Sequence, residues 1–281
     1  QNAANGAYYT ADYAAKNTRP DDIHTARRTR AADLSVLSRI AAETLGIRLS
    51  PPRAEYQKDG SVSIEYRAAN RFDVVFGEAH RPKDGISGDV KAALKLGGDK
   101  FIAVLSDGMG HGARANSSGE NAIALVESFY RAGFTDEIVI PFVNRALCAV
   151  SGGVFATLDM CVVDLIDGSV SFVKMGSDDS YIRRKNRVET IENTALPLGA
   201  SDDASPSVLN KRLDADDFVV LVSDGIANAF NEGGLKDLIS QINTKNPQAF
   251  ADELLKCALY NGVRDDLSVI ALRLYRKIGN M

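Results

Sequence analysis

Two apolar segments that end in the same three residues constrain the fold of this chain more than any other feature. Residues 101–108 read FIAVLSDG, and residues 218–225 read FVVLVSDG. Short apolar runs bounded by polar residues are typical of buried strands. A packed strand fixes a side chain at its end, and the following glycine allows a close approach that a Cβ would block. One Asp-Gly pair is a common turn, but two copies after matching strands indicate a shared role for Asp107 and Asp224.

Acidic residues also precede two further segments with strand character. Ser-Gly-Asp at 87–89 comes before an alternating segment at 90–96, and Arg-Asp-Asp at 264–266 comes before another at 267–274. Carboxylates gathered at strand ends repel one another unless cations neutralise them. Oxygen ligands suit Mg²⁺ or Mn²⁺, and three histidines without a cysteine cluster argue against zinc. The sequence therefore predicts a site for divalent cations built from Asp89, Asp107, Asp224 and Asp265, with the Gly108 carbonyl as a further oxygen ligand.

The predicted cations indicate hydrolysis of a phosphate ester. A water shared by two divalent cations becomes a nucleophile near neutral pH, and the cations offset the charge on the phosphoryl oxygens. The chain has no Asp-x-Asp-x-Thr/Val segment of the kind found in aspartyl-phosphate enzymes. None of its three cysteines begins the Cys-x5-Arg spacing of a thiolate phosphatase. A covalent intermediate on the protein is therefore not predicted.

The order of the predicted elements indicates an α+β fold rather than a parallel sheet. Strands come in hairpin-linked blocks, with turns at Gly97-Gly98-Asp99 and Asp167-Gly168, and pairs of helices separate the blocks. The expected strands are 61–68, 73–79, 90–96, 101–106, 158–166, 169–175, 180–184, 188–191, 208–213, 218–223 and 267–274. The expected helices are 112–132, 135–150, 234–243 and 247–260. This pattern predicts an α-β-β-α sandwich, in which two antiparallel sheets are flanked by helix pairs.

The N-terminal part is expected to be separate from this domain. Residues 1–20 have no period and are interpreted as a linker or tail, and residues 21–46 show a helical pattern. The apolar positions of that pattern are Leu34, Leu37, Ile40, Ala41, Thr44 and Leu45. The helix either docks on the core or acts as a regulatory or dimerising element. The expected division is 1–50 for the linker and helix, and 51–281 for the catalytic domain.

Charge and cysteine content exclude several classes of protein. The 281 residues carry a net charge of -4, which gives no support for nucleic-acid binding. Positive charge for a phosphate must therefore come from a few local residues or from cations. Three widely spaced cysteines favour a reducing cytoplasm, and the apolar runs are too short to cross a bilayer. Because the chain begins with Gln1, we expect a soluble cytoplasmic piece of a longer protein, and a membrane anchor elsewhere in that protein stays open.

The ordered set of acidic motifs resembles the type 2C metal-dependent protein phosphatases, and within that family the stage II sporulation phosphatases. The motifs that carry the resemblance are Ser87-Gly-Asp89, the segment SDGMGHGA at 106–113, Ser223-Asp-Gly225 and Arg264-Asp-Asp-Leu-Ser268. Supporting segments are Arg81-Pro-Lys-Asp84, Thr157-Leu-Asp159 and Leu196-Pro-Leu-Gly199. The likeness covers residues 70–276. It implies the same α-β-β-α sandwich and two Mn²⁺ or Mg²⁺ ions.

The resemblance also implies a role for each acidic residue. Asp107 resembles the ligand that bridges the two cations, and Gly108 resembles the residue whose carbonyl is a ligand. Asp224 and Asp265 resemble ligands of the first cation, and Asp89 resembles the acidic contact to the second. The four aspartates are therefore the expected catalytic and metal-binding residues.

The expected contacts with the substrate phosphate are less closely matched. Arg81, Lys83 and His111 are the candidates, and His111 is interpreted first as a residue that shapes the turn and caps the following helix. Asp266 is an alternative to Asp265 as a ligand. Three further aspartates are interpreted as turn or surface residues, namely Asp159, Asp178 and Asp179.

The resemblance implies a phosphoserine or phosphothreonine protein phosphatase whose substrate is a phosphorylated anti-anti-sigma factor, so that its reaction controls a sigma factor in sporulation. In bacterial relatives the helix pair that matches 112–150 switches the metal site, whereas the simpler interpretation is that both helices only cover the sheet. Val126 and Val143 are the expected apolar contacts of that pair. Three other functions stay open. They are an inactive phosphatase-like binding module, a stress-response phosphatase with another substrate, and a calcium-dependent structural protein, for which no Asp-x-Asp-x-Asp-Gly loop is present.

Overall fold

The computed structural model describes residues 8–14, 23–56, 61–83, 85, 87–108, 113–149, 155–185 and 187–277. The chain divides into two compact units, Gln1–Asn70 and Arg71–Met281, and each is described by itself. No helix among the described residues has the length and apolar character needed to span a membrane.

The N-terminal unit is a small antiparallel sheet with one long helix. Its elements are β1 (Tyr8–Ala14), α1 (Ile23–Leu45), β2 (Arg53–Tyr56) and β3 (Ser61–Arg67), and the strand order is β1-β3-β2. Leu34 and Leu37 of α1 pack against Ile64 and Tyr66 of β3. The helix expected at 21–46 is thereby confirmed, although Ile40 of the expected apolar face is exposed.

Two expectations for this unit differ from the structure. The interpretation of residues 1–20 as a tail is wrong for β1, which pairs with β3 from Tyr8 opposite Arg67 to Ala14 opposite Ser61. The unit also extends to Asn70, whereas the sequence suggested a division after residue 50. The reason is that β3 pairs with β1 on one side and with β2 on the other, so both β2 and β3 group with the N-terminal strand.

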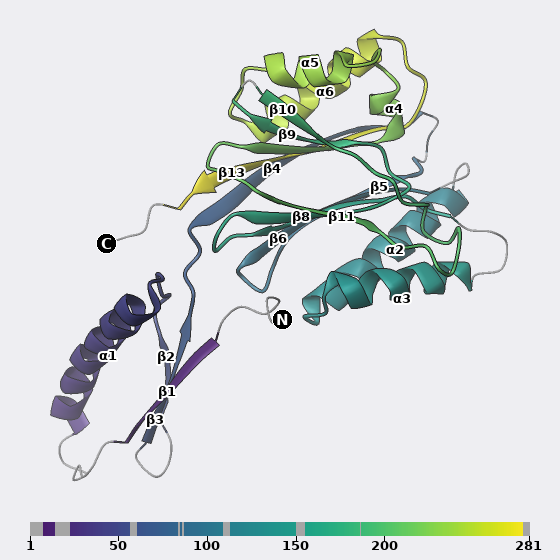
Figure 1. Ribbon diagram of the computed structural model, residues 1–281. Coiled ribbons are helices and arrows are strands. Elements are labelled where there is room, and N and C mark those ends of the chain that lie inside the picture. The colour runs from purple at the N-terminus through teal and green to yellow at the C-terminus, as the bar shows by residue number, and fades with distance from the viewer. Residues whose placement is uncertain are drawn as a thin grey trace. The chain divides into compact units, whose positions relative to one another are not determined.

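The C-terminal unit contains two five-stranded antiparallel sheets with helices on their outer faces (Figure 1). One sheet has the order β10-β9-β12-β13-β4, and the other has the order β11-β8-β7-β6-β5. The strands are β4 (Phe72–Arg81), β5 (Asp89–Leu96), β6 (Lys100–Asp107), β7 (Leu158–Asp164), β8 (Ser169–Met175), β9 (Ser180–Arg184), β10 (Arg187–Ile191), β11 (Ser207–Arg212), β12 (Phe218–Val222) and β13 (Leu267–Arg276). The helices are α2 (Ala113–Arg131), α3 (Asp136–Cys148), α4 (Asp224–Ala227), α5 (Gly234–Gln241) and α6 (Pro247–Tyr260). The predicted α-β-β-α sandwich of an α+β protein is confirmed.

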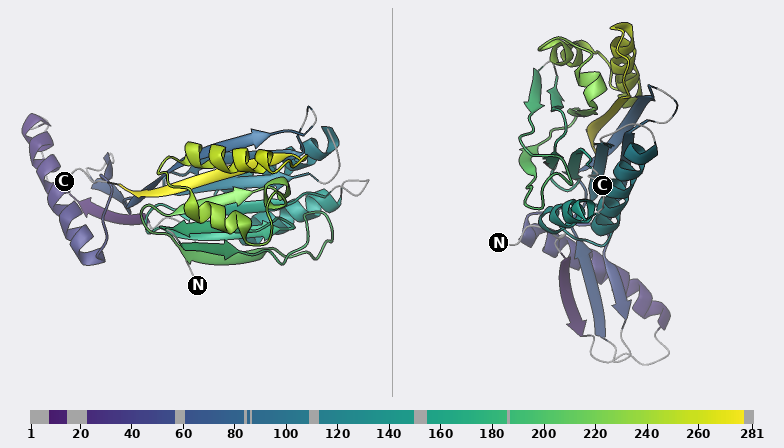
Figure 2. Two further views of the ribbon diagram at one scale, coloured as in Figure 1. Left: turned by 90° about the horizontal axis from the view of Figure 1, so that it is seen from above. Right: turned by 90° about the vertical axis from the view of Figure 1, so that its right-hand side faces the viewer.

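Three groups of buried apolar side chains correspond to the layers of this sandwich. One group joins α5 and α6 to the sheet that contains β12 and β13, and Figure 2 shows these helices lying over that sheet. A second group lies between the two sheets, and a third joins α2 and α3 to the sheet that contains β6 and β7. Each sheet is therefore buried on both faces.

Burial on both faces explains the two matching apolar segments. In β6, Phe101, Ala103 and Leu105 point between the sheets, while Ile102 and Val104 face α2 and α3. The same alternation divides β12, where one set of side chains faces the other sheet and the remainder face α5 and α6. A strand buried on both sides needs a continuous apolar run rather than an alternating one. Both segments therefore form rigid interior strands, and Ser-Asp ends β6 and directly follows β12.

Candidate active site

The first half of the candidate site lies where β5 begins and β6 ends. Asp89 and Asp107 are direct partners across these antiparallel strands. Asp107 is fixed by Thr157, since its backbone N–H donates to the Thr157 hydroxyl (2.8 Å) and its carbonyl accepts from the Thr157 N–H (2.8 Å). The Ser106 hydroxyl donates to the Thr157 carbonyl, and the Gly108 N–H donates to the Gly88 carbonyl. The backbone at the end of β6 is therefore held from both sides.

The second half of the site belongs to the other sheet. Asp224 begins α4 directly after β12, and Asp265 and Asp266 immediately precede β13. Gly225 is needed here, because a Cβ on it would lie 2.2 Å from the Asp266 carbonyl oxygen and 3.2 Å from the Asp265 Cβ. The segment after β12 therefore lies against the segment before β13, and Asp224 lies beside the pair 265–266. We call Asp89, Asp107, Asp224, Asp265 and Asp266 the acidic rim.

Asp266 links the two halves of the acidic rim. Its Oδ1 accepts from the backbone N–H of Lys83 at 2.7 Å, and its Oδ2 accepts from that of Gly88 at 2.8 Å. Lys83 and Gly88 lie on the connection from β4 to β5, which passes from one sheet to the other. Asp265 differs, since its side chain is 48% exposed and, among the described residues, accepts a hydrogen bond only from the N–H of Asp266. It also lies 4.0 Å from the Lys83 ammonium. Asp265 therefore keeps the oxygens that are free to bind a ligand.

The carboxylates of the acidic rim act on one another electrostatically. Burial raises the pKa of Asp107 to about 7, with further increases from the charges of Asp89, Asp224, Asp266 and Asp265. Burial also raises the pKa of Asp89 to about 6, and it raises the pKa of Asp224, to which the charge of Asp265 adds. One charge shifts the pKa of another in this way only when the two groups lie close together, so these residues are near one another although they are far apart in the sequence. Asp107 and Asp224 are therefore on the same side of the molecule.

The carboxylate oxygens of Asp89 are buried, and the described residues leave them without hydrogen-bond partners. Asp89 is 7% exposed, and among the described residues no group hydrogen-bonds to either of its carboxylate oxygens. The nearby hydroxyls of Ser268 and Ser223 lower the pKa of Asp89, but burial raises it by more. A buried carboxylate without partners is costly, and a cation removes that cost. The donor set of oxygens fits Mg²⁺ or Mn²⁺.

The acidic rim does not by itself surround a cation completely. Within the described ranges, no three carboxylate, imidazole or thiol groups are gathered closely enough to hold a metal ion alone. Mg²⁺ is commonly bound by one or two carboxylates together with waters and substrate oxygens. Cations at this rim would therefore be held by pairs of aspartates, the Gly108 carbonyl and water.

The residues expected to contact phosphate have different surroundings. Lys83 lies at the edge of the acidic rim, with its ammonium 4.0 Å from Asp265. Arg81 is the exposed last residue of β4, opposite Leu267 of β13. His111 lies outside the described residues. Lys83 is therefore the candidate that the described structure brings closest to the acidic rim.

Three aspartates that the sequence analysis set aside lie closer to the site than expected. The interpretation of Asp159 as a turn or surface residue is wrong, because it is 1% exposed and contacts the ammonium of Lys174, itself fully buried. Asp178 and Asp179 follow β8, and the charge of Asp224 contributes to raising the pKa of Asp178, after burial. The signal available in the sequence was Lys174 itself, a charged residue inside the apolar segment SVSFVKM.

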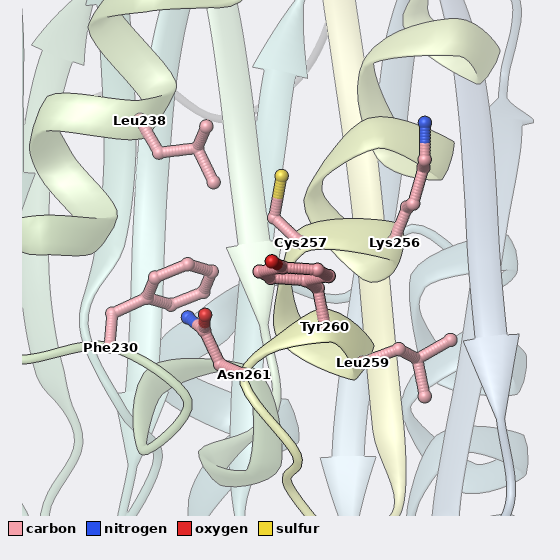
Figure 3. Close-up of a pocket in the computed structure, with 7 residues that line it drawn as sticks. All are labelled: Phe230, Leu238, Lys256, Cys257, Leu259, Tyr260 and Asn261. Carbon is pink, nitrogen blue, oxygen red and sulfur yellow. The ribbon is translucent and has the colours of Figure 1, made fainter.

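A separate hollow of about 580 Å³ lies between α5 and the end of α6. Figure 3 shows Phe230 and Leu238 facing Cys257 and Tyr260 across it. Its lining is mainly apolar and includes no residue of the acidic rim. It therefore adds no group to the chemistry at the strand ends.

Comparison with known proteins gives consistent results. The profile of the family Stage II sporulation protein E (SpoIIE) matches residues 97–275. Stage II sporulation protein E of Bacillus subtilis (strain 168) is 30% identical over 227 residues, which are 77% of this chain and 27% of that protein. The protein of the same name from Priestia megaterium is 29% identical over 76% of this chain and 39% of its own length. This chain therefore spans well under half of these curated relatives.

Solved structures match both the fold and the sequence. A structure of the PP2C phosphatase domain with a fragment of the regulatory domain of SpoIIE from Bacillus subtilis has a TM-score of 0.73 and 29% identity, covering 84% of this chain and 75% of that one. The serine/threonine phosphatase Stp1 from Staphylococcus aureus has a TM-score of 0.60 and covers 72% of this chain and 94% of its own, but at 19% identity it shows the fold alone.

Proposed function

Because the chain belongs to the family Stage II sporulation protein E (SpoIIE), we propose that it is a metal-dependent phosphatase that hydrolyses phosphoserine or phosphothreonine esters on a protein. The observation that carries this proposal is the acidic rim, in which carboxylates from two sheets raise one another's pKa. Within the described part of the chain, the oxygens of Asp89 also have no hydrogen-bond partner. Gathered carboxylates repel one another and would repel an anionic substrate, so the acidic rim suits divalent cations better than a phosphate ester alone.

In this proposal each aspartate has its own position. Asp107 would contact both cations, the Gly108 carbonyl and Asp89 would help to hold the second, and Asp224 and Asp265 would hold the first. Asp265 is favoured over Asp266 because both oxygens of Asp266 already accept backbone N–H groups. When bound, two divalent cations, Mn²⁺ or Mg²⁺, activate a water for attack on phosphorus and offset charge on the phosphoryl oxygens.

The remaining groups orient the substrate. Lys83 is placed at the rim, where its ammonium can contact a phosphoryl oxygen once Asp265 is engaged by a cation. Arg81 and His111 are further proposed phosphate contacts. The two hydrogen bonds with Thr157 hold the backbone of Asp107 in place. The site therefore needs little rearrangement as charge develops on the reacting phosphate.

The proposed substrate is a phosphorylated anti-anti-sigma factor, whose dephosphorylation would control a sigma factor in sporulation. The proposed setting is the cytoplasm, as a domain of a longer protein. A second copy of the chain is the proposed partner of α1, where Val36 and Ile40 are 45% and 51% exposed. Sedimentation of the wild type beside an Ile40→Glu variant tests that dimer, and equal molecular masses would rule it out.

The test of the activity is dephosphorylation of a phosphorylated anti-anti-sigma factor in Mn²⁺, Mg²⁺ or chelator. Asp107→Asn and Asp224→Asn are each expected to lower kcat by at least about a hundredfold, because they remove groups that hold cations at the reacting phosphate. Asp237→Asn, at an exposed position on α5, is the matched control and should leave the rate unchanged. A wild-type protein that binds the phosphoprotein without hydrolysing it would instead establish an inactive binding module.

The same assay separates the sporulation function from a stress-response function. The values of kcat/KM for phosphorylated anti-anti-sigma factors from the two systems are compared in one preparation. A clear preference for the stress-response protein would overturn the proposed substrate but not the proposed chemistry.

A further inference from the structure

Three polar side chains form a closed set of contacts inside the sandwich. Lys174 on β8 is fully buried, and its ammonium lies 2.7 Å from Oδ1 of Asp159 on β7 and 2.6 Å from the hydroxyl of Ser180 on β9. The Ser180 hydroxyl donates to Oδ2 of Asp159 at 2.5 Å. Both carboxylate oxygens are therefore engaged, as a buried ion pair requires. We call Asp159, Lys174 and Ser180 the buried triad.

The buried triad joins the two sheets. Asp159 and Lys174 are direct cross-strand partners in the sheet that contains β7 and β8, whereas Ser180 belongs to the sheet that contains β9 and β12. Apolar contact between sheets is non-directional, so it fixes the alignment of one sheet on the other less narrowly than a hydrogen bond does. Hydrogen bonds have narrow ranges of length and angle. Ser180 therefore gives the sheets a defined relative position.

On one sheet, the buried triad lies just below the first half of the acidic rim. Asp159 pairs with Leu105 of β6, and Asp107 is two residues further along the same strand. Thr157, which holds the backbone of Asp107, is also two residues from Asp159. A displacement of Asp159 would therefore be passed directly to the segment that fixes Asp107.

On the other sheet, the buried triad lies just below the second half of the acidic rim. Tyr181, the neighbour of Ser180, pairs with Val220 of β12. Asp224 follows on the segment that leaves β12 in the direction of the same rim. The hydroxyl of Ser180 therefore ties the strand beside Asp224 to the strand beside Asp107, below the link that Asp266 makes at the acidic rim itself.

We propose that Ser180, held by Lys174 and Asp159, is a positioning residue that sets the separation between the two halves of the acidic rim and thereby the affinity for divalent cations. This inference rests on the proposed function for the identity of the ligands. The halves contribute Asp107 from one sheet and Asp224 with Asp265 from the other, so a cation shared between them is sensitive to the alignment of the sheets.

The direct test is Ser180→Ala, with Mn²⁺ binding followed by electron paramagnetic resonance on the full chain without substrate. The variant keeps the ion pair between Asp159 and Lys174, which lies within one sheet. It removes only the Ser180 hydroxyl, which contacts that pair from the other sheet. The dissociation constant for Mn²⁺ is expected to rise roughly tenfold, as for other groups that position metal ligands, while kcat at saturating Mn²⁺ stays within about twofold.

Ser171→Ala is the matched control. Ser171 is also a strand serine whose hydroxyl donates to an aspartate, Asp136 on α3, but it makes no contact across the two sheets. Its Mn²⁺ dissociation constant should equal that of the wild type. A Ser180→Ala protein with a lower Tm and an unchanged dissociation constant would overturn the proposal and leave Ser180 a merely structural residue.

A second pair of variants separates position from stability. Lys174→Met leaves Asp159 buried without its cation, so a large fall in Tm is expected, whereas Lys174→Met combined with Asp159→Leu removes both charges and should recover much of that fall. The double variant should still bind Mn²⁺ roughly tenfold more weakly than the wild type. Wild-type affinity in the double variant would also overturn the proposal. A wild-type chain that binds Mn²⁺ but hydrolyses no phosphoprotein would overturn only the proposed function.

Discussion

At the scale of single residues, the neighbouring aspartates before β13 have different surroundings. Asp266 accepts two backbone N–H groups and so joins the segment before β13 to the connection between β4 and β5. Asp265 is half-exposed and has Lys83 as its cationic neighbour. A carboxylate whose oxygens are both occupied stabilises the fold, whereas one with free oxygens can bind a cation.

This difference predicts opposite effects for the two substitutions. Asp266→Asn puts an amide NH₂ against one of the two backbone donors, so it should lower the free energy of unfolding by about 1–3 kcal/mol. Asp265→Asn should leave the stability of the metal-free protein nearly unchanged and weaken Mn²⁺ binding. Urea unfolding and Mn²⁺ titration of both variants check this. Stronger loss of Mn²⁺ affinity in Asp266→Asn would exchange the two roles.

The raised pKa of Asp107 predicts how pH affects the metal-free protein. The pKa of Asp107 is about 7 in the folded chain and near the ordinary aspartate value of 3.8 in the unfolded chain, so the folded state binds more protons between these two pH values. The free energy of unfolding therefore falls as pH rises through this window. Thermal unfolding in chelator should give a lower Tm at about pH 8 than at about pH 5. Asp107→Asn should flatten this dependence, and an unchanged slope would contradict the explanation.

The sequence identified the residues of the acidic rim but not the buried triad. Asp107 and Asp224 were recognisable because each ends a strand whose apolar run is readable locally. Ser180 gave no such signal, since its significance depends on Lys174 and Asp159 meeting it across two sheets. Pairing of this kind is a property of the folded sandwich rather than of any one segment.

At the scale of elements, α2 and α3 bury a common face. Val126 and Val143 are fully buried, in the group that joins both helices to β6 and β7. Asn144 of α3 also accepts from the Gly199 N–H and donates to the Ser201 carbonyl, which ties the helix to the loop after β10. The two helices therefore have both apolar and directional contacts with the body of the unit.

Truncation of those two valines tests whether the helix pair acts as a switch. Val126→Ala and Val143→Ala should each lower the free energy of unfolding by roughly 1–3 kcal/mol through the cavity they leave. If the helices bias the metal site, the Mn²⁺ dissociation constant and kcat should change as well. Val139→Ala, in the same apolar group, provides a comparison of burial alone. A fall in Tm without a change in metal binding would show that the helices only cover the sheet.

The elements that the sequence missed share a physical cause. The strands of the sandwich were predictable because burial on both faces gives them long apolar runs. By contrast, β1 and β2 contain polar residues and no long apolar run. Both become strands by pairing with β3, which for β1 is distant in the sequence. The short helix α4 begins at Asp224 itself, where the Ser-Asp-Gly motif was interpreted as a strand end followed by a close backbone approach.

At the scale of the whole molecule, the unit Arg71–Met281 contains what the proposed site needs. Its three groups of buried apolar side chains consist entirely of residues from Phe72 onwards. Its first residue is also anchored within the unit, since the Arg71 N–H donates to the Leu165 carbonyl and the Arg71 carbonyl accepts from the Lys277 N–H. A part with its own core and anchored ends is expected to fold independently.

Residues 71–281 produced alone should therefore unfold in one cooperative transition and bind Mn²⁺ within about threefold of the affinity of the full chain. Saturation with Mn²⁺ at about a hundred times the dissociation constant should add roughly 2.7 kcal/mol to the free energy of unfolding, because the ion binds only the folded state. Calorimetry of both chains with and without Mn²⁺ measures these quantities. If the shorter chain folds but loses the stabilisation by Mn²⁺, the N-terminal unit takes part in forming the metal site. An equal gain in both chains places the whole site within 71–281, as the position of the acidic rim requires.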